Sequence, residues 1–188
     1  MVSLSEEIVR WGFEVALQSS QDWKIAFTNP TAGPWKKISG SNKEGKVGEV
    51  HRFEIDETRP DLVIYSDINM AVIIIEAKTS ISGLVDRDQI TKTSQMYSRL
   101  TDKLQSCAQN PYWNDRASYA YYLGLLWGTE KFNENTEILN LVNKYEQESS
   151  SDGNDILCIE GTFIAGILEH KLAWGSQNST VSIDKIFP

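Results

Sequence analysis

The sequence predicts an α/β fold with a central mixed β-sheet flanked by helices. The run Ala71–Ile75 is apolar throughout and rich in β-branched residues, as expected of a central strand covered on both faces. Residues 3–19 and 86–108 repeat their apolar positions at helical intervals. Short connections join the strand-like runs and favour antiparallel neighbours. The expected order is a helix, three strands, a helix and a strand.

Length and composition limit the class of protein. The 188 residues fit one domain over 1–188, with a core at about 3–127 and a C-terminal extension at about 128–188. With 40% hydrophobic and 23% charged residues, the chain has an ordinary globular composition. The N-terminus has no basic, apolar export signal, and no apolar run approaches the about 20 residues of a membrane helix. We therefore expect a cytoplasmic protein.

The first predicted element is a helix over residues 3–19. Ser3 and Glu6 have the spacing of a capping box. Four apolar residues recur at helical intervals and predict one buried stripe: Leu4, Ile8, Trp11 and Val15. Residues 28–48 are rich in Gly, Pro, Ser, Asn and Lys and predict a loop.

The middle of the chain predicts three strands in close succession. These are Val47–Ile55, Asp61–Tyr65 and Ala71–Ile75. A long helix over 86–108 follows, and then a strand over Ser118–Trp127.

The C-terminal extension is predicted to be α-rich. Residues 136–147 form an amphipathic helix, Ile156–Ile159 a short strand, and residues 163–173 another helix.

Three charged residues lie where two of the predicted strands meet. Asp61 opens one strand, and Glu76 and Lys78, two residues apart, share one face of the next. If the two strands form a hairpin, Asp61 and Glu76 approach each other. Two such carboxylates repel unless a cation lies between them. The pattern predicts an oxygen-ligand site for Mg²⁺ with a lysine beside it.

This pattern resembles the PD-(D/E)XK nuclease superfamily. Pro60-Asp61 matches the first half of its motif and Glu76-Ala77-Lys78 the second half. The predicted αβββαβ order is similar to the common core of that superfamily, the restriction-endonuclease-like fold. The resemblance covers about residues 3–127.

The resemblance implies Mg²⁺-dependent hydrolysis of phosphodiesters, with Mn²⁺ as a substitute ion. Asp61 and Glu76 would bind the metal together with a backbone carbonyl near Ala77. Lys78 would orient or deprotonate the attacking water and contact the scissile phosphate. These three residues are the predicted catalytic residues.

Two further contributions are implied by the resemblance. Many members add a glutamate from the first helix, and here Glu7 or Glu14 could face the metal. Some members carry a glutamine and a tyrosine on the helix after the lysine. The residues available there are Gln89, Gln95 and Tyr97, at a spacing that differs from that pattern.

The charge distribution bears on nucleic-acid binding. The net charge of −8 argues against indiscriminate binding to nucleic acids. Residues 30–52, however, hold five basic residues against two acidic ones, and these basic side chains are candidate contacts to the DNA backbone: Lys36, Lys37, Lys43, Lys46 and Arg52. The alternative is a solvated loop with no ligand.

The expected function is that of a DNA-cleaving enzyme. A type II-like restriction endonuclease, or its catalytic subunit, fits the features best, and a homodimer or a partner subunit would supply specificity. One alternative is a repair, recombination or transposition nuclease that recognises DNA structure. Another, from a different class, is a DNA-binding or assembly subunit that keeps the nuclease fold without cleaving.

Overall fold

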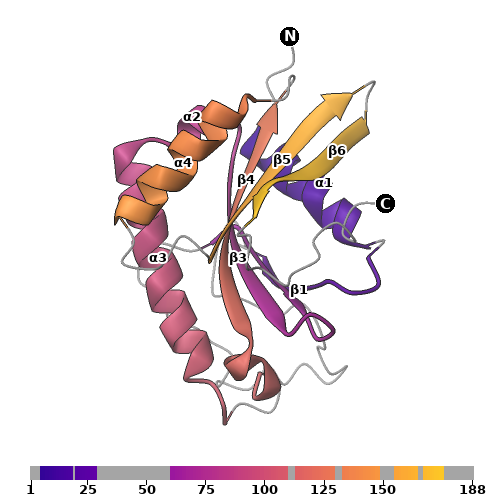
Figure 1. Ribbon diagram of the computed structural model, residues 1–188. Helices are drawn as coiled ribbons and strands as arrows, with labels where there is room; N and C mark the ends of the chain where they lie inside the picture. The colour runs from indigo at the N-terminus through magenta and orange to yellow at the C-terminus, as the bar shows by residue number, and fades with distance from the viewer. Residues whose placement is uncertain are drawn as a thin grey trace.

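A computed structural model gives the fold of the chain. It describes these residues: 5–18, 20–28, 60–109, 113–129, 133–148, 155–164 and 167–175. Within them, six strands form one mixed sheet and helices lie on both of its faces (Figure 1). The predicted α/β class is confirmed.

The strands follow the chain order across the sheet, from β1 to β6. Their bounds are β1 Lys24–Thr28, β2 Leu62–Ser66, β3 Ala71–Lys78, β4 Ala120–Thr129, β5 Ile156–Ile164 and β6 Ile167–Gly175. β1, β2 and β3 are antiparallel neighbours, whereas β3, β4 and β5 run parallel to one another. β6 returns antiparallel to β5.

The strand β3 lies at the centre of this arrangement. It pairs with β2 on one side and β4 on the other, and all of its residues except Lys78 are buried. A strand covered on both faces needs apolar side chains on both, which explains the uninterrupted apolar run Ala71–Ile75. The prediction of a central strand is confirmed.

The helices form two layers. On one face of the sheet lies α1 (Glu6–Gln18), and on the other lie α3 (Arg87–Gln105) and α4 (Asn135–Glu148) (Figure 1). The short helices α2 (Ile81–Leu84) and η2 (Asp115–Ser118) precede α3 and β4. Each face thus has its own hydrophobic core, and the sheet separates the two.

The predicted apolar stripe of the first helix is wrong. The buried residues of α1 are Val9, Phe13 and Leu17, whereas Ile8, Trp11 and Val15 are exposed. At about 100° per residue, these two stripes lie on opposite sides of the helix. Both repeat at helical spacing, so packing against the sheet decides which one is buried. Ser3 and Leu4 lie outside the described residues, and Ser5 Oγ accepts the hydrogen bond from the Ile8 amide at 3.3 Å.

The first strand of the sheet was not predicted. β1 has only five residues, and its pairing with β2 is interrupted by a register shift between Ile25 and Phe27. So short a segment carries little periodicity of its own, and the β2 ladder stabilises it. The predicted strand Val47–Ile55 lies outside the described residues.

The α-rich C-terminal extension is also wrong. Of the residues 163–173, predicted as a helix, 163–164 belong to β5 and 167–173 to β6, and the two strands pair antiparallel. A short apolar run does not distinguish a helix from a strand, and here the ladder partners decide. The other two predicted elements of this extension are confirmed: the amphipathic helix is found as α4, and the strand Ile156–Ile159 forms part of β5.

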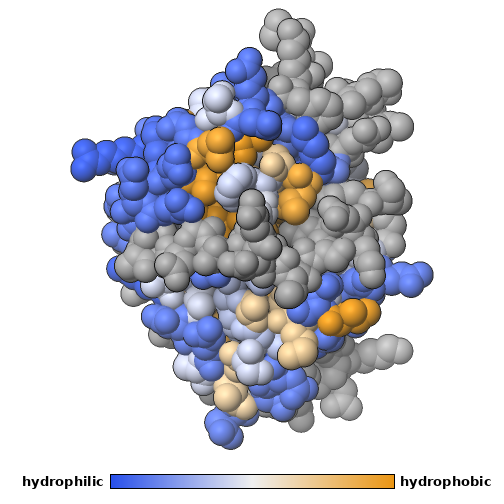
Figure 2. Space-filling view, in the orientation of Figure 1, coloured by the Kyte–Doolittle hydropathy of each residue, from blue (hydrophilic) through white to orange (hydrophobic). Residues whose placement is uncertain are grey.

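The surface carries a few exposed large hydrophobic residues. Among the residues that the structure describes, those besides the three on α1 are Ile68, Met70 and Leu139. On the face seen in Figure 2, hydrophobic residues form separate patches with hydrophilic residues beside them. Among the described helices, none has the length and apolar character needed to cross a membrane.

The orientation of α1 can be tested with two aromatic substitutions. Phe13→Ala should lower the free energy of unfolding by about 3–5 kcal/mol, because it leaves a cavity in the core. Trp11→Ala removes a side chain that is 64% exposed and should change it by about 0.5 kcal/mol or less. Urea denaturation measures both. A larger loss for Trp11→Ala would contradict the orientation of α1.

Candidate metal centre

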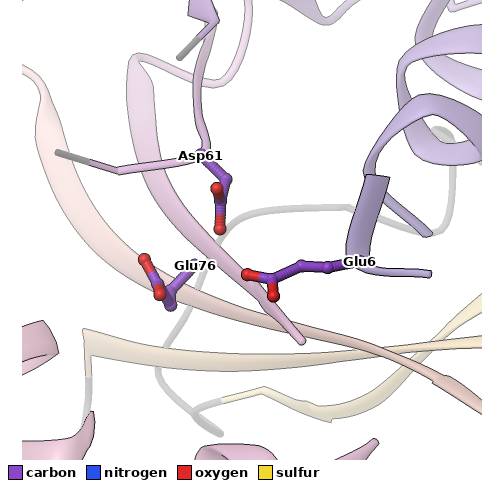
Figure 3. Close-up of side chains that lie close together, drawn as sticks. All are labelled: Glu6, Asp61 and Glu76. Atoms are coloured by element: carbon purple, nitrogen blue, oxygen red, sulfur yellow. The ribbon is translucent and has the colours of Figure 1, made fainter. Parts of the chain in front are cut away.

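Three carboxylates meet at the end of β3. Asp61 directly precedes β2, Glu76 lies in β3, and Glu6 is the first residue of α1. One oxygen of each lies within 4.8 Å of the others, and their side chains converge from two strands and a helix (Figure 3). Glu76 is buried, and the other two are half-buried.

The β2–β3 ladder brings Asp61 and Glu76 together. Leu62 pairs with Ile75, and the Asp61 amide continues the ladder by donating to the Ile75 carbonyl at 3.0 Å. Asp61 Oδ2 in turn accepts from the Ala77 amide at 2.8 Å. This bond fixes one carboxylate oxygen and leaves Asp61 Oδ1 for another ligand. The predicted approach of Asp61 and Glu76 is confirmed.

Lys78 closes the cluster with its ammonium group. Lys78 Nζ donates to Glu6 Oε1 at 2.6 Å, to Glu76 Oε1 at 2.8 Å and to the Ala77 carbonyl at 3.0 Å. These three bonds use all the donors of an ammonium. The side chain of Lys78 is only 19% exposed, so both ion pairs are partly shielded from water.

The helix α3 also contacts the cluster, through a hydrogen bond from Gln89 to Glu76. Gln89 Nε2 donates to Glu76 Oε1 at 2.8 Å and to Thr93 Oγ1 at the same distance. The backbone of Gln89 is held by the N-cap of α3, because Asp86 Oδ1 accepts from its amide. Of the candidates on this helix, Gln89 thus reaches the site. Gln95 is exposed, and the Tyr97 hydroxyl donates to the Tyr121 carbonyl.

Burial and the repulsion between neighbouring carboxylates raise the pKa values of Asp61 and Glu76. Burial, together with the nearby charge of Asp61, raises the pKa of Glu76 to about 7. Burial also raises the pKa of Asp61, against the opposing effects of the Ala77 amide and the Lys78 charge. Burial alone would lower the pKa of Lys78, but Glu76 and Glu6 outweigh it and hold this pKa above its usual value.

The donor set fits a hard divalent cation. Carboxylate oxygens and the Ala77 carbonyl are the ligands that Mg²⁺, Mn²⁺ and Ca²⁺ accept. The raised pKa values of Asp61 and Glu76 reflect buried negative charge that the single ammonium does not fully compensate. Glu6 lies in the first turn of α1, where the helix dipole also favours negative charge.

The glutamate that α1 contributes is Glu6, and the two predicted alternatives point elsewhere. Glu7 is exposed, and Glu14 Oε1 pairs with Arg10 at 3.2 Å. The physical reason is the orientation of α1. Glu6 precedes Val9 by three residues and lies on the buried side of α1, together with Phe13 and Leu17. A helix register taken from Val9, Phe13 and Leu17 would have found it.

The structure contains a second buried carboxylate that sequence reasoning missed. Glu160 is fully buried in β5, and its Oε1 accepts from Trp127 Nε1 and from the backbone and side-chain nitrogens of Asn133. Its Oε2 pairs with Lys171 at 3.3 Å. These contacts hold Asn133, which lies shortly before α4. The available signal was a charged residue inside an apolar strand, the same signal that identified Glu76.

Among the described residues, the histidine His170 is not part of the carboxylate cluster. His170 is buried and meets the Phe13 ring edge-on, and burial lowers its pKa to about 4. A histidine with that pKa is neutral near pH 7. The basic candidates for DNA contact lie outside the described residues: Lys36, Lys37, Lys43, Lys46 and Arg52.

Comparisons with known proteins add no family to this description. No protein-family model, curated protein or solved structure matches the chain. The functional interpretation therefore depends on the residues at the end of β3 and on their geometry.

The raised pKa of Glu76 predicts a specific pH dependence of stability. The folded protein binds the Glu76 proton with a pKa of about 7, against 4.5 in the unfolded chain. The bound proton contributes fully to the free energy of unfolding below about pH 4.5, and this contribution is lost as the pH rises through 7. Relative to Glu76→Gln, the wild type should lose roughly 2–3 kcal/mol across this window. Urea denaturation in EDTA measures the difference, and a flat profile would contradict the shift.

Proposed function

We propose that this protein is a Mg²⁺-dependent nuclease that hydrolyses phosphodiester bonds in DNA, with Mn²⁺ as a substitute ion. The observation that carries the proposal is the meeting of Glu6, Asp61 and Glu76 with Lys78 at the end of a buried central strand. Three carboxylates and a lysine at one point are costly to bury without a purpose. Binding of a divalent cation beside the Lys78 side chain would explain why the chain keeps these charged residues together.

The arrangement of elements supports a restriction-endonuclease-like core. Among the described residues, the order α1, β1, β2, β3, α3 and β4 fits the αβββαβ order that the resemblance to the PD-(D/E)XK superfamily implies, apart from the short helices α2 and η2. The first of these strands is β1, and the predicted first strand Val47–Ile55 lies in the segment between β1 and β2 that the structure does not describe. The antiparallel β2–β3 pair carries the two halves of the motif, and β4 lies parallel to β3. We propose the superfamily on the strength of this order together with the motif residues.

Each residue of the site has a proposed role. Glu6, Asp61 and Glu76 would hold the cation together with the Ala77 carbonyl. A bound Mg²⁺ supplies activation of water and neutralisation of charge at the phosphate. Lys78 would orient the attacking water and contact the phosphate, and Gln89 would position Glu76 through its hydrogen bond.

The most suitable biological activity is that of a type II-like restriction endonuclease or its catalytic subunit. Cleavage of both strands needs two sites, which favours a homodimer or a partner subunit. With a net charge of −8, the protein would contact DNA only locally, and the basic segment 30–52 is the proposed contact.

A cleavage assay on plasmid and linear DNA tests this function. Wild-type protein should cut in Mg²⁺ but not in EDTA. Asp61→Asn should lose cleavage by at least about 100-fold, because it weakens the metal centre. The matched control is Asp67→Asn, which removes an exposed carboxylate that pairs with Arg116 at the other end of β2.

The products of this assay separate the alternatives. Discrete fragments would support a sequence-specific endonuclease. Cleavage confined to branched or flapped DNA would favour a structure-specific nuclease instead. Wild-type protein that binds DNA but never cleaves it would contradict the enzymatic proposal and leave a binding subunit.

The contribution of α1 is tested by a pair of neighbouring glutamates. Glu6→Gln should lower kcat/KM by about 10-fold to 100-fold, because it removes a charge that lies against the cation site. Glu7→Gln changes an exposed carboxylate and should leave the rate unchanged. Steady-state cleavage of a fluorescent oligonucleotide measures both. A larger loss for Glu7→Gln would contradict the assignment of Glu6.

A further inference from the structure

We propose that the Lys78 ammonium occupies the cation position of the carboxylate cluster and leaves it when a divalent cation binds. Lys78 would then set the affinity of the site for metal, in addition to its role toward the substrate. This inference rests on the proposed function, because it concerns the same metal centre.

The hydrogen bonds of Lys78 carry the inference. Its ammonium lies 2.6 Å from Glu6 Oε1, 2.8 Å from Glu76 Oε1 and 3.0 Å from the Ala77 carbonyl. These oxygens belong to three of the four groups that would hold the metal. The ammonium therefore takes up oxygens that a divalent cation needs. In this conformation Lys78 is directed into the carboxylates rather than toward a substrate.

A divalent cation would compete with the ammonium for these oxygens. Mg²⁺ binds oxygens at about 2.0–2.1 Å and requires near-octahedral geometry. An ammonium bonded to the same oxygens would lie close to the metal ion, and like charges at such a distance repel. In the proposed exchange, cation binding breaks the bonds from Lys78 Nζ to Glu76 Oε1 and Glu6 Oε1.

The stem of Lys78 packs closely against α2. An added Cβ at Gly83 would lie 3.3 Å from the Lys78 Cβ, 3.5 Å from its Cγ and 3.6 Å from its Cδ. A glycine at this position lets α2 hold the stem in place without crowding it, so the proposed exchange moves the ammonium end of the side chain. A released ammonium remains tethered next to the cluster, where a phosphate would bind.

The test measures Mn²⁺ binding by isothermal titration calorimetry, without substrate. Lys78→Met keeps the length of the side chain but removes the competing charge, so it should bind Mn²⁺ about tenfold or more tightly than the wild type. Lys92→Met removes the same charge from an exposed position on α3 and should leave the affinity nearly unchanged. Asp61→Asn should bind much more weakly than either.

The outcomes distinguish this inference from the proposed function. If wild type binds Mn²⁺ and folded Lys78→Met binds it no more tightly, the exchange is overturned while the metal centre stands. If neither protein binds Mn²⁺, the result contradicts both the proposed metal centre and the exchange. Circular dichroism checks that each variant is folded.

A measurement on the wild-type protein gives an independent readout of the exchange. Acylation of lysines by an amine-reactive ester, followed by mass spectrometry, reports how accessible each ammonium is. Saturating Ca²⁺ should raise the labelling of Lys78 severalfold relative to the exposed Lys92, because it frees Lys78 from its three acceptors. Labelling of Lys78 that does not change with Ca²⁺ would overturn the proposal.

Discussion

The candidate site depends on the register between β2 and β3. This ladder extends to Asp61, whose amide donates to the Ile75 carbonyl and whose carboxylate accepts from the Ala77 amide. The two bonds tie the start of one strand to the end of the other. A slip of one residue would turn Glu76 and Lys78 to the opposite face of the sheet, away from Asp61 and Gln89. Because both faces of β3 are buried, such a slip would move the charged Glu76 into the opposite hydrophobic core, and the cost of burying that charge opposes the slip.

The electrostatics of the cluster differ from those of a site built only for stability. Three carboxylates face one ammonium, and burial raises the pKa of both Asp61 and Glu76. Replacing buried ions by apolar residues is often neutral or stabilising, so the folded chain gains little from keeping them. A site of this kind is typical of function, because the negative charge that destabilises the empty cluster is what attracts a cation.

The second polar cluster shows what a stabilised buried carboxylate looks like in the same sheet. Glu160 has hydrogen bonds from Trp127 and Asn133 and an ion pair with Lys171, and no second carboxylate competes with it among the contacts described. It holds Asn133 against β5. The two clusters differ in the balance of charge, and that difference is why only the one at the end of β3 is interpreted as a cation site.

The sequence by itself determined the features that depend on local periodicity. Alternation along a strand puts Glu76 and Lys78 on one face, and the short connection to β2 brings Asp61 beside them. The buried positions of α3 and α4 likewise follow from strong single stripes. These elements carry only one reasonable pattern, so neighbours along the chain suffice to predict them.

Only the tertiary structure decided the rest, because it depends on contacts between distant segments. α1 carries two apolar stripes, and packing on the sheet selected Val9, Phe13 and Leu17, which brings Glu6 rather than Glu7 or Glu14 to the site. Residues 163–164 and 167–173 are in strands because β4 offers β5 a parallel partner and β5 in turn pairs with β6. In both places the local sequence permits two arrangements, and burial against the sheet or hydrogen bonding within it selects one of them.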